Sequence, residues 1–212
     1  MFKLKNSAQI LFIFLCLNSC NGQSKQIADC KDNYKKAVAN LSNYYINKDT
    51  ASLPESLTDV EKAMGCSETK RSAIDLKISL LILLKQYKAG YTFVDSASIK
   101  DFNPEYKKNM AYDFFHALEY ESKGDTIERN LVLNKAISEV QIYIQSEEAD
   151  NRKFDEAAYY DLLVLKVKML DKQQIKTEVD SLKVRYPTHA DFFESVKESL
   201  LNEEKVAHLN TQ

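Results

Sequence analysis

Apolar residues recur at intervals of three and four along most of the chain. Between residues 30 and 47 they include Tyr34, Val38 and Leu41. Side chains at this spacing line one face of an α-helix. Later segments repeat the spacing with a larger set: Leu57, Val60, Ala63, Met110, Phe114, Leu118, Leu133, Ala136, Val140, Leu162, Leu165, Met169, Ile175, Val179 and Leu182. The pattern predicts an all-α protein built of amphipathic helices.

The most apolar part of the chain after residue 20 needs a separate interpretation. Residues 78–84 (ISLLILL) would be apolar almost all round a helix, so neighbours should cover that helix on several sides. A buried strand is the competing interpretation. The polar flanks lack glycine and proline, which favours one long helix. Residues 89–99 predict a shorter helix.

Turn signals are few, because only four glycines and three prolines occur in 212 residues. This scarcity favours long helices over a many-stranded β fold. Turns are expected at four places: Asp49, Lys88, Gly124 and Asp171. They recur at roughly 36 to 47 residues, the period expected of stacked helix-turn-helix units.

Two further segments should interrupt or start helices. Asn103–Pro104 has the pattern of a helix start, with asparagine as the cap and proline as the first helical residue. Residues 147–153 are predicted to form a charged loop.

Residues 155–187 resemble a tetratricopeptide repeat. They combine a helix with small residues near its start, a short polar turn, a second helix and a proline that ends it. Leu, Val or Thr occupy most positions where that family has Gly or Ala. The resemblance implies a tetratricopeptide-like α-solenoid of antiparallel helix pairs, and an irregular helical bundle is the alternative.

The first residues have the organisation of a secretory signal. Lys3 and Lys5 form a short basic region, and residues 10–17 (ILFIFLCL) are an uninterrupted apolar run. Crossing the hydrocarbon of a bilayer takes about twenty apolar residues, so this run has only the length of a signal-peptide core. Residues 1–19 are therefore predicted to be removed.

Residues 17–20 (LNSC) resemble the lipobox of bacterial lipoproteins, with an aliphatic residue at −3, a small one at −1 and then the acceptor cysteine. The sequence CNGQ from residue 20 is similar to lipoproteins of the Bacteroidetes. The resemblance implies cleavage before Cys20 and acyl chains on that residue, which anchor the protein in the cell envelope, at the outer membrane and facing the periplasm. An ordinary signal peptide with an incidental cysteine is the alternative.

The remaining chain then divides by composition. Residues 20–27 hold the lipidated cysteine and a polar, flexible tether, 28–201 form the helical domain, and 202–212 are a polar tail.

Two cysteines remain after the predicted signal peptide and anchor are set aside. Cys30 lies at the start of one predicted helix and Cys66 at the end of the next. These ends are neighbours in an antiparallel hairpin, and compartments beyond the inner membrane permit disulfides. A Cys30–Cys66 disulfide is predicted, with two buried free thiols as the alternative.

Candidate chemistry is sparse. The chain has three histidines, and none has a second histidine or cysteine at zinc-ligand spacing. His116 has Asp113 one helical turn away, but a packed structural histidine is favoured over a catalytic pair. No nucleophile elbow or glycine-rich phosphate loop occurs in the sequence. The sequence predicts no catalytic residue, no metal site and no cofactor.

Aromatic residues are frequent, with twelve Tyr, ten Phe and no Trp. They include four doublets, at 44–45, 114–115, 159–160 and 192–193. Neighbours on a helix point about 100° apart, so one ring of each doublet can enter the core while the other lies near its edge. Tyrosine at such an edge suits an interface, and ordinary core packing is the alternative.

Four tripeptides resemble the Asp-Ser/Thr-aliphatic sites of Bacteroidetes O-glycosylation. The resemblance implies candidate sugar attachment at Thr50, Ser96, Thr126 and Ser181. The same residue types cap helices and form turns, which is the alternative explanation of these tripeptides.

Charge narrows the choice of partner. The whole chain has a net charge of −2, and loss of Lys3 and Lys5 makes it more negative. No basic block remains, which argues against nucleic acid and against an anionic lipid face as partners. The sequence predicts a membrane-anchored, non-catalytic scaffold that binds an envelope protein or peptide. A ligand- or glycan-binding lipoprotein of an outer-membrane uptake system is the alternative, and the absence of Trp counts against sugar stacking.

Overall fold

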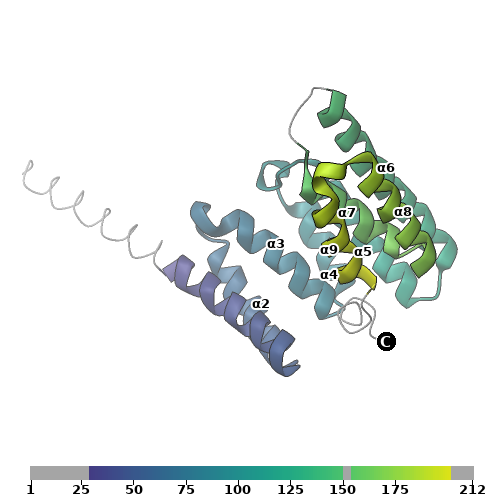
Figure 1. The fold of residues 1–212 in the computed structure, drawn as a ribbon. Helices are drawn as coiled ribbons and strands as arrows, with labels where there is room; N and C mark the ends of the chain where they lie inside the picture. Colours follow the sequence, from purple (N-terminus) through teal and green to yellow (C-terminus); the bar gives the residue numbers. More distant parts are fainter. Residues whose placement is uncertain (1–28, 150–153, 202–212) are drawn as a thin grey trace, which may run out of the picture. The chain divides into compact units, whose positions relative to one another are not determined.

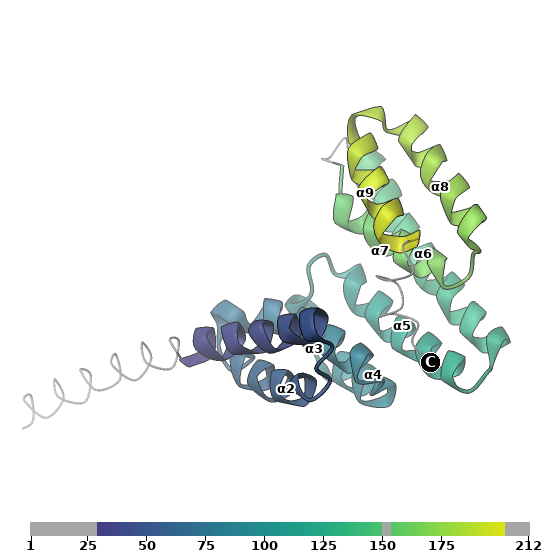
Figure 2. The same ribbon diagram turned by 60° about the horizontal axis from the view of Figure 1, so that its bottom comes forward.

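The structure is a computed structural model that describes residues 29–149 and 154–201. All regular secondary structure in these two ranges is helical, which confirms the all-α prediction (Figures 1 and 2). The chain divides into two compact units, Met1–Leu80 and Leu81–Gln212. The predicted signal peptide, tether and C-terminal tail lie outside the described residues.

The first unit contains a helix over residues 29–47, then α2 (Ser52–Ala63) and most of α3 (Ser67–Leu83). The expected turn at Asp49 is present, and the carboxylate of this residue accepts a hydrogen bond from the backbone N–H of Ala51 at 3.0 Å. Gly65 follows Met64, the C-cap residue of α2.

Small side chains bring the first helix and α2 together. Ala37, Val60 and Ala63 are fully buried. The buried Ser56 hydroxyl donates to the backbone carbonyl of Ala37 at 2.7 Å. A hydroxyl that reaches the backbone of the facing helix at this distance fixes the two helices side by side.

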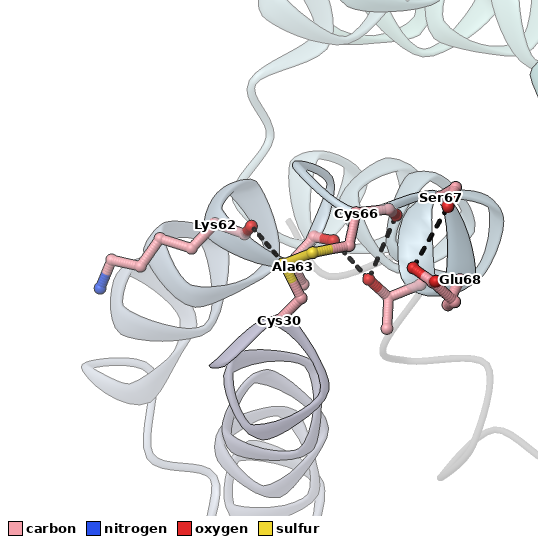
Figure 3. The surroundings of a disulfide bond; sticks show 7 residues. Cys30, Lys62, Ala63, Cys66, Ser67 and Glu68 are labelled. Atoms are coloured by element: carbon pink, nitrogen blue, oxygen red, sulfur yellow. Dashed lines mark hydrogen bonds between the residues drawn. A yellow bond between two sulfur atoms is a disulfide. The ribbon is translucent and has the colours of Figure 1, made fainter. Parts of the chain in front are cut away.

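The predicted disulfide between Cys30 and Cys66 is confirmed (Figure 3). Their Cα atoms lie 6.2 Å apart, within the ordinary range for a disulfide, across 36 positions of sequence. Both cysteines are buried. The Thr69 hydroxyl donates to the carbonyl of Ala63 at 2.5 Å, which ties the start of α3 to the end of α2.

The second unit begins within α3 and consists of further helices. These are α4 (Tyr87–Ser96), η1 (Ile99–Asp101), α5 (Tyr106–Ser122), α6 (Thr126–Ala149), α7 (Glu156–Val167), α8 (Lys172–Arg185), η2 (Pro187–His189) and α9 (Ala190–Leu201). The apolar run of residues 78–84 is helical through Leu83, and Leu80 and Leu81 are buried. The helix interpretation of that run was therefore correct.

Three boundaries differ from the sequence prediction. Helix α4 begins at Tyr87, so the turn expected at Lys88 lies earlier, at residues 84–86. The Asn103–Pro104 bond is cis, and α5 begins later, at Tyr106, without a side-chain cap. The predicted charged loop also starts too early, because α6 continues through Glu147 and Glu148 to Ala149. Residues 150–153 lie outside the described part.

Aspartates define the starts of three helices in this unit. Asp125 accepts from the backbone N–H of Glu128 at 3.1 Å, and Asp155 accepts from that of Ala158 at 3.1 Å. Asp171 forms a complete capping box with Gln174. Each carboxylate satisfies an N–H group that the first turn of a helix leaves without an intrahelical partner.

Helices α5 to α9 share one apolar core. Its completely buried members are Leu133, Ala136, Val140, Ala158, Leu163, Ile175, Val179 and Phe193. The Phe114–Phe115 doublet lies wholly inside, so the expectation that one ring of each doublet lies at the edge is wrong there. It holds for Tyr159–Tyr160, of which the first is buried and the second exposed.

Helices α4 and α5 approach closely at Gly90. A Cβ atom built there would lie 2.2 Å from the ring of Phe115, which is itself fully buried. Glycine is therefore required by the space between the two helices rather than by its backbone angles.

Removal of the disulfide should destabilise the first unit. We expect Cys30→Ser/Cys66→Ser to lower the free energy of unfolding by about 3–4 kcal/mol, because the unfolded chain regains the entropy of a 36-residue loop. Denaturant unfolding of the oxidised protein and of the double variant measures this. Equal midpoints for the two proteins would contradict the expectation.

Gly90→Ala should destabilise the packing of α4 on α5 by about 1–2 kcal/mol, because overpacking outweighs the gain in helix propensity. Ala89→Gly, at an exposed position of the same helix, measures how much the difference in helix propensity between Ala and Gly contributes to stability. The stability of each variant is measured by thermal unfolding. Stabilisation by Gly90→Ala would show that Phe115 moves aside at little cost.

Candidate functional site

The residues singled out in the sequence lie in separate places. Cys20, the predicted lipid attachment site, lies outside the described residues. Among the candidate glycosylation residues, Thr50, Ser96 and Thr126 are exposed at helix ends, and Ser181 is exposed within α8. The preceding Asp49 and Asp125 each bond a backbone N–H at a helix start, so helix capping explains the aspartates of two of the four tripeptides.

A groove lies between α6, α7 and α8 on the second unit. It encloses about 130 Å³ and is open to solvent. Its floor is apolar and consists of the buried residues Ile144, Tyr159, Leu162 and Leu182. Its rim is polar: Gln141, Gln145, Glu148, Lys166, Glu178 and Arg185.

Each rim residue is placed by its helix. Gln141 and Gln145 are one turn apart on α6, so their carboxamides project from the same face. Lys166 on α7 forms an ion pair with Glu178 on α8 across the groove. A carboxamide offers both donors and an acceptor, so this rim can bond to either kind of polar group on a partner.

Glu148 is the polar centre at one end of the groove. Its carboxylate accepts hydrogen bonds from the hydroxyls of Tyr159, at 2.6 Å, and Tyr186. Its second oxygen pairs with the guanidinium of Arg185 at 3.0 Å. The two tyrosine hydroxyls lie 2.6 Å apart. The end of α6 is thereby held to α7 and to the end of α8.

These partners determine the ionisation of Glu148. Burial alone would raise the pKa of its carboxyl group, but the two tyrosine hydrogen bonds and the charge of Arg185 outweigh burial and hold the pKa below its ordinary value. Burial and the hydrogen bond to this carboxylate raise the pKa of Tyr159. At neutral pH the centre therefore consists of a carboxylate and two neutral phenols.

A second network of tyrosines and carboxylates, in which the carboxylates are aspartates, joins α5, α6 and α7. The Tyr106 hydroxyl donates to Asp161 at 2.8 Å, and the Tyr143 hydroxyl donates to Asp155 at 3.0 Å. The two tyrosine rings are 4.6 Å apart. Burial raises the pKa of Asp161 despite the nearby charge of Lys107. Every hydroxyl in this network is already donated to a carboxylate, so its arrangement is that of a structural support.

A larger depression of about 480 Å³ lies beside the start of α7. Its lining is acidic and aromatic: Glu147, Phe154, Asp155, Glu156, Ala157 and His189. The Phe154 ring stacks on His189 at 3.9 Å and on Tyr159 at 4.7 Å, both nearly parallel. Two parallel neighbours this close must cover opposite faces, so the Phe154 ring has no face left on which a sugar could stack.

The remaining histidine of the described chain is held by aromatic rings. His116 stacks on Tyr91 at 4.2 Å and lies 4.6 Å from Tyr112. The buried Asp113 pairs with Lys135 at 3.0 Å, so the ion pair of this aspartate is made with a lysine of α6. Residues 29–149 and 154–201 contain no cluster of three side chains that could hold a metal ion.

Comparisons with known proteins give no match. No family model, curated protein or solved structure matches this chain. Within the described ranges, no helix is both long enough and apolar enough to cross a membrane.

Sequence reasoning missed Glu148. The sequence pattern places Glu147 and Glu148 in the charged loop predicted for residues 147–153. The hydrogen-bond partners of Glu148, Tyr159 and Tyr186, are eleven and 38 positions away in the sequence. Only the packing of three helices brings them together.

Glu148→Gln should lower the free energy of unfolding at pH 7 by about 1–2 kcal/mol, because charge-assisted hydrogen bonds become neutral ones. The folded-state pKa of Glu148 lies below its ordinary value of 4.5, so its carboxylate stabilises the fold above that pH. This contribution disappears as the pH falls through the folded-state pKa. The difference between wild type and variant should therefore shrink at acidic pH.

Glu198→Gln, at an exposed position of α9, is the matched control and should have little effect. The raised pKa of Asp161 makes its contribution to stability larger at acidic pH, which opposes the effect of Glu148. The contribution of Glu148 is therefore read from the difference in stability between wild type and Glu148→Gln, and not from the pH dependence of the wild type alone. Chemical denaturation at several pH values provides the measurement. A difference that is unchanged from pH 7 to pH 3 would contradict the assignment.

Proposed function

We propose that this chain is a membrane-anchored lipoprotein that binds an envelope protein or peptide through its helical surface, without catalysis. The observation that carries the proposal is the groove between α6, α7 and α8, with its apolar floor and polar rim. This division is typical of protein interfaces, in which a desolvated centre is surrounded by polar groups.

The size of the groove supports a protein partner. Pockets for small molecules usually enclose about 300–1,000 Å³ and bury most of their ligand. The groove encloses about 130 Å³ and is open, which suits one or two side chains of a larger partner. The covered faces of Phe154 in the larger depression also disfavour a glycan ligand there.

We further propose that the helices form a tetratricopeptide-like arrangement. In support, a short turn at Asp171 joins α7 to α8, and Pro187 comes directly after Tyr186, the C-cap residue of α8. These are the features that residues 155–187 share with such repeats. Solenoids of this kind expose extended surfaces for partners, because each repeat contacts only its neighbours.

The anchor can be tested independently of the groove. We expect the native protein to carry acyl chains on Cys20 and to remain with the membrane after washing at high salt. Cys20→Ser should abolish both acylation and membrane retention. Intact-mass measurement and membrane fractionation provide the test. Acylation absent from the wild-type protein would contradict the lipoprotein proposal.

The groove is tested by photo-crosslinking in the native envelope. A photoreactive residue in place of Gln145, on the rim, should give a discrete protein adduct. The same residue in place of Gln173, exposed on α8 but outside the groove lining, is the matched control. An adduct at neither position, or equally at both, would count against this groove as a binding site.

A further inference from the structure

The helix over residues 29–47 exposes one continuous face that combines apolar and basic side chains. Its members are Lys31, Lys35, Val38, Ala39, Ser42, Tyr45 and Ile46, and each is exposed. They recur at intervals of three and four, so they share one side of the helix. This set is called the outer face below.

The outer face exposes three large apolar side chains. Ile46 is 77% exposed, Tyr45 46% and Val38 39%, on a single helix of the first unit. The opposite side of the same helix carries the buried Cys30 and Ala37 and is occupied by packing within the unit. The outer face therefore leaves most of Ile46 and part of Val38 exposed to solvent.

Charge on the outer face differs from that of the chain as a whole. The protein has an excess of acidic residues, yet the outer face contains two lysines and no acidic side chain. Asp32, which is also exposed, lies at the edge of the outer face, one turn before Lys35 and two turns before Ala39, and Asp29 falls on another side of the helix. The overall charge balance argued against an anionic lipid partner, but that balance averages over all faces and hides this one.

We propose that the outer face rests on the surface of a lipid bilayer that contains anionic phospholipid. This inference rests on the proposed lipidation of Cys20. Isoleucine and valine can enter the boundary between headgroups and acyl chains, and tyrosine is favoured at that depth. Lysines extend their charged ends toward phosphate groups while their stems cover apolar surface.

The position of the helix in the chain favours a bilayer over another occupant. Nine residue steps separate Cys20 from Asp29, so the chain between them spans at most about 32 Å. From Asp29 to Ile46 the helix rises about 26 Å. An anchor at Cys20 therefore places the start of the helix within about 32 Å of the membrane that holds the acyl chains, which is near enough for the outer face to lie along that membrane.

Fluorescence quenching in reconstituted vesicles tests this contact. The lipidated full-length mature protein is placed in vesicles of phosphatidylethanolamine and phosphatidylglycerol, with a fluorophore on Ser42→Cys. Ser72→Cys, exposed on α3 of the same unit, carries the control fluorophore. The cysteines of the disulfide do not react with the label. We expect a quencher on the lipid acyl chains to quench the label at residue 42 and to leave that at residue 72 largely unaffected.

Variants then distinguish binding by the outer face from non-specific adsorption of the protein to the vesicles. Ile46→Asp together with Lys31→Gln and Lys35→Gln should reduce quenching at residue 42 to the level at residue 72. Ile127→Asp, which places the same charge on an equally exposed isoleucine of α6, should leave quenching unchanged. Mass measurement of the acyl chains on Cys20 accompanies every variant.

The outcomes distinguish the two proposals. If Cys20 is acylated but residues 42 and 72 are quenched equally, the outer-face inference is overturned while the lipoprotein proposal stands. If residue 42 is shielded from a water-soluble quencher and also from the lipid quencher, a protein covers the face and the inference is again overturned. If Cys20 carries no acyl chain, both proposals fall together.

Discussion

Each helix of the second unit depends on burying an apolar stripe against its neighbours. Short helices are marginal in water, so most of their stability comes from packing. Leu133 and Val140 of α6, Leu163 of α7, and Ile175 and Val179 of α8 are completely buried in one core. Because these stripes must face one another, the helices lie side by side with short turns. The aspartate caps fix where each helix begins.

The groove and its polar centre follow from that packing. Helix α6 has 24 residues, twice as many as α7, and its last turn carries Glu148. A carboxylate carried into a half-buried place must gain hydrogen bonds or a countercharge, or it becomes protonated. Tyr159, Tyr186 and Arg185 supply both. The same helices leave an apolar floor beside this centre, where a partner's side chain can replace water.

The first unit adds two further devices to the burial of large side chains such as Leu53, Ile74 and Leu80. Where its first helix meets α2, small residues lie at the contact, with Ala37 and Ala63 fully buried and Ser56 bonded to the facing backbone. Small side chains allow a close approach but bury little apolar area. A disulfide that closes a long loop adds stability without adding core volume. On the outer face of the first helix, Val38 and Ile46 remain exposed to solvent.

The sequence by itself determined the helical class, most turns and the disulfide, because all three depend on spacing along one chain. Periodicity located the helices, and Cys30 and Cys66 fell at neighbouring ends of a predicted hairpin. Periodicity did not predict the late start of α5 or the extension of α6, since tertiary contacts can override local sequence signals. Only the tertiary structure decided the groove, the role of Glu148 and the clearance at Gly90. Each depends on residues of different helices meeting in space, and the order of residues does not encode those distances directly.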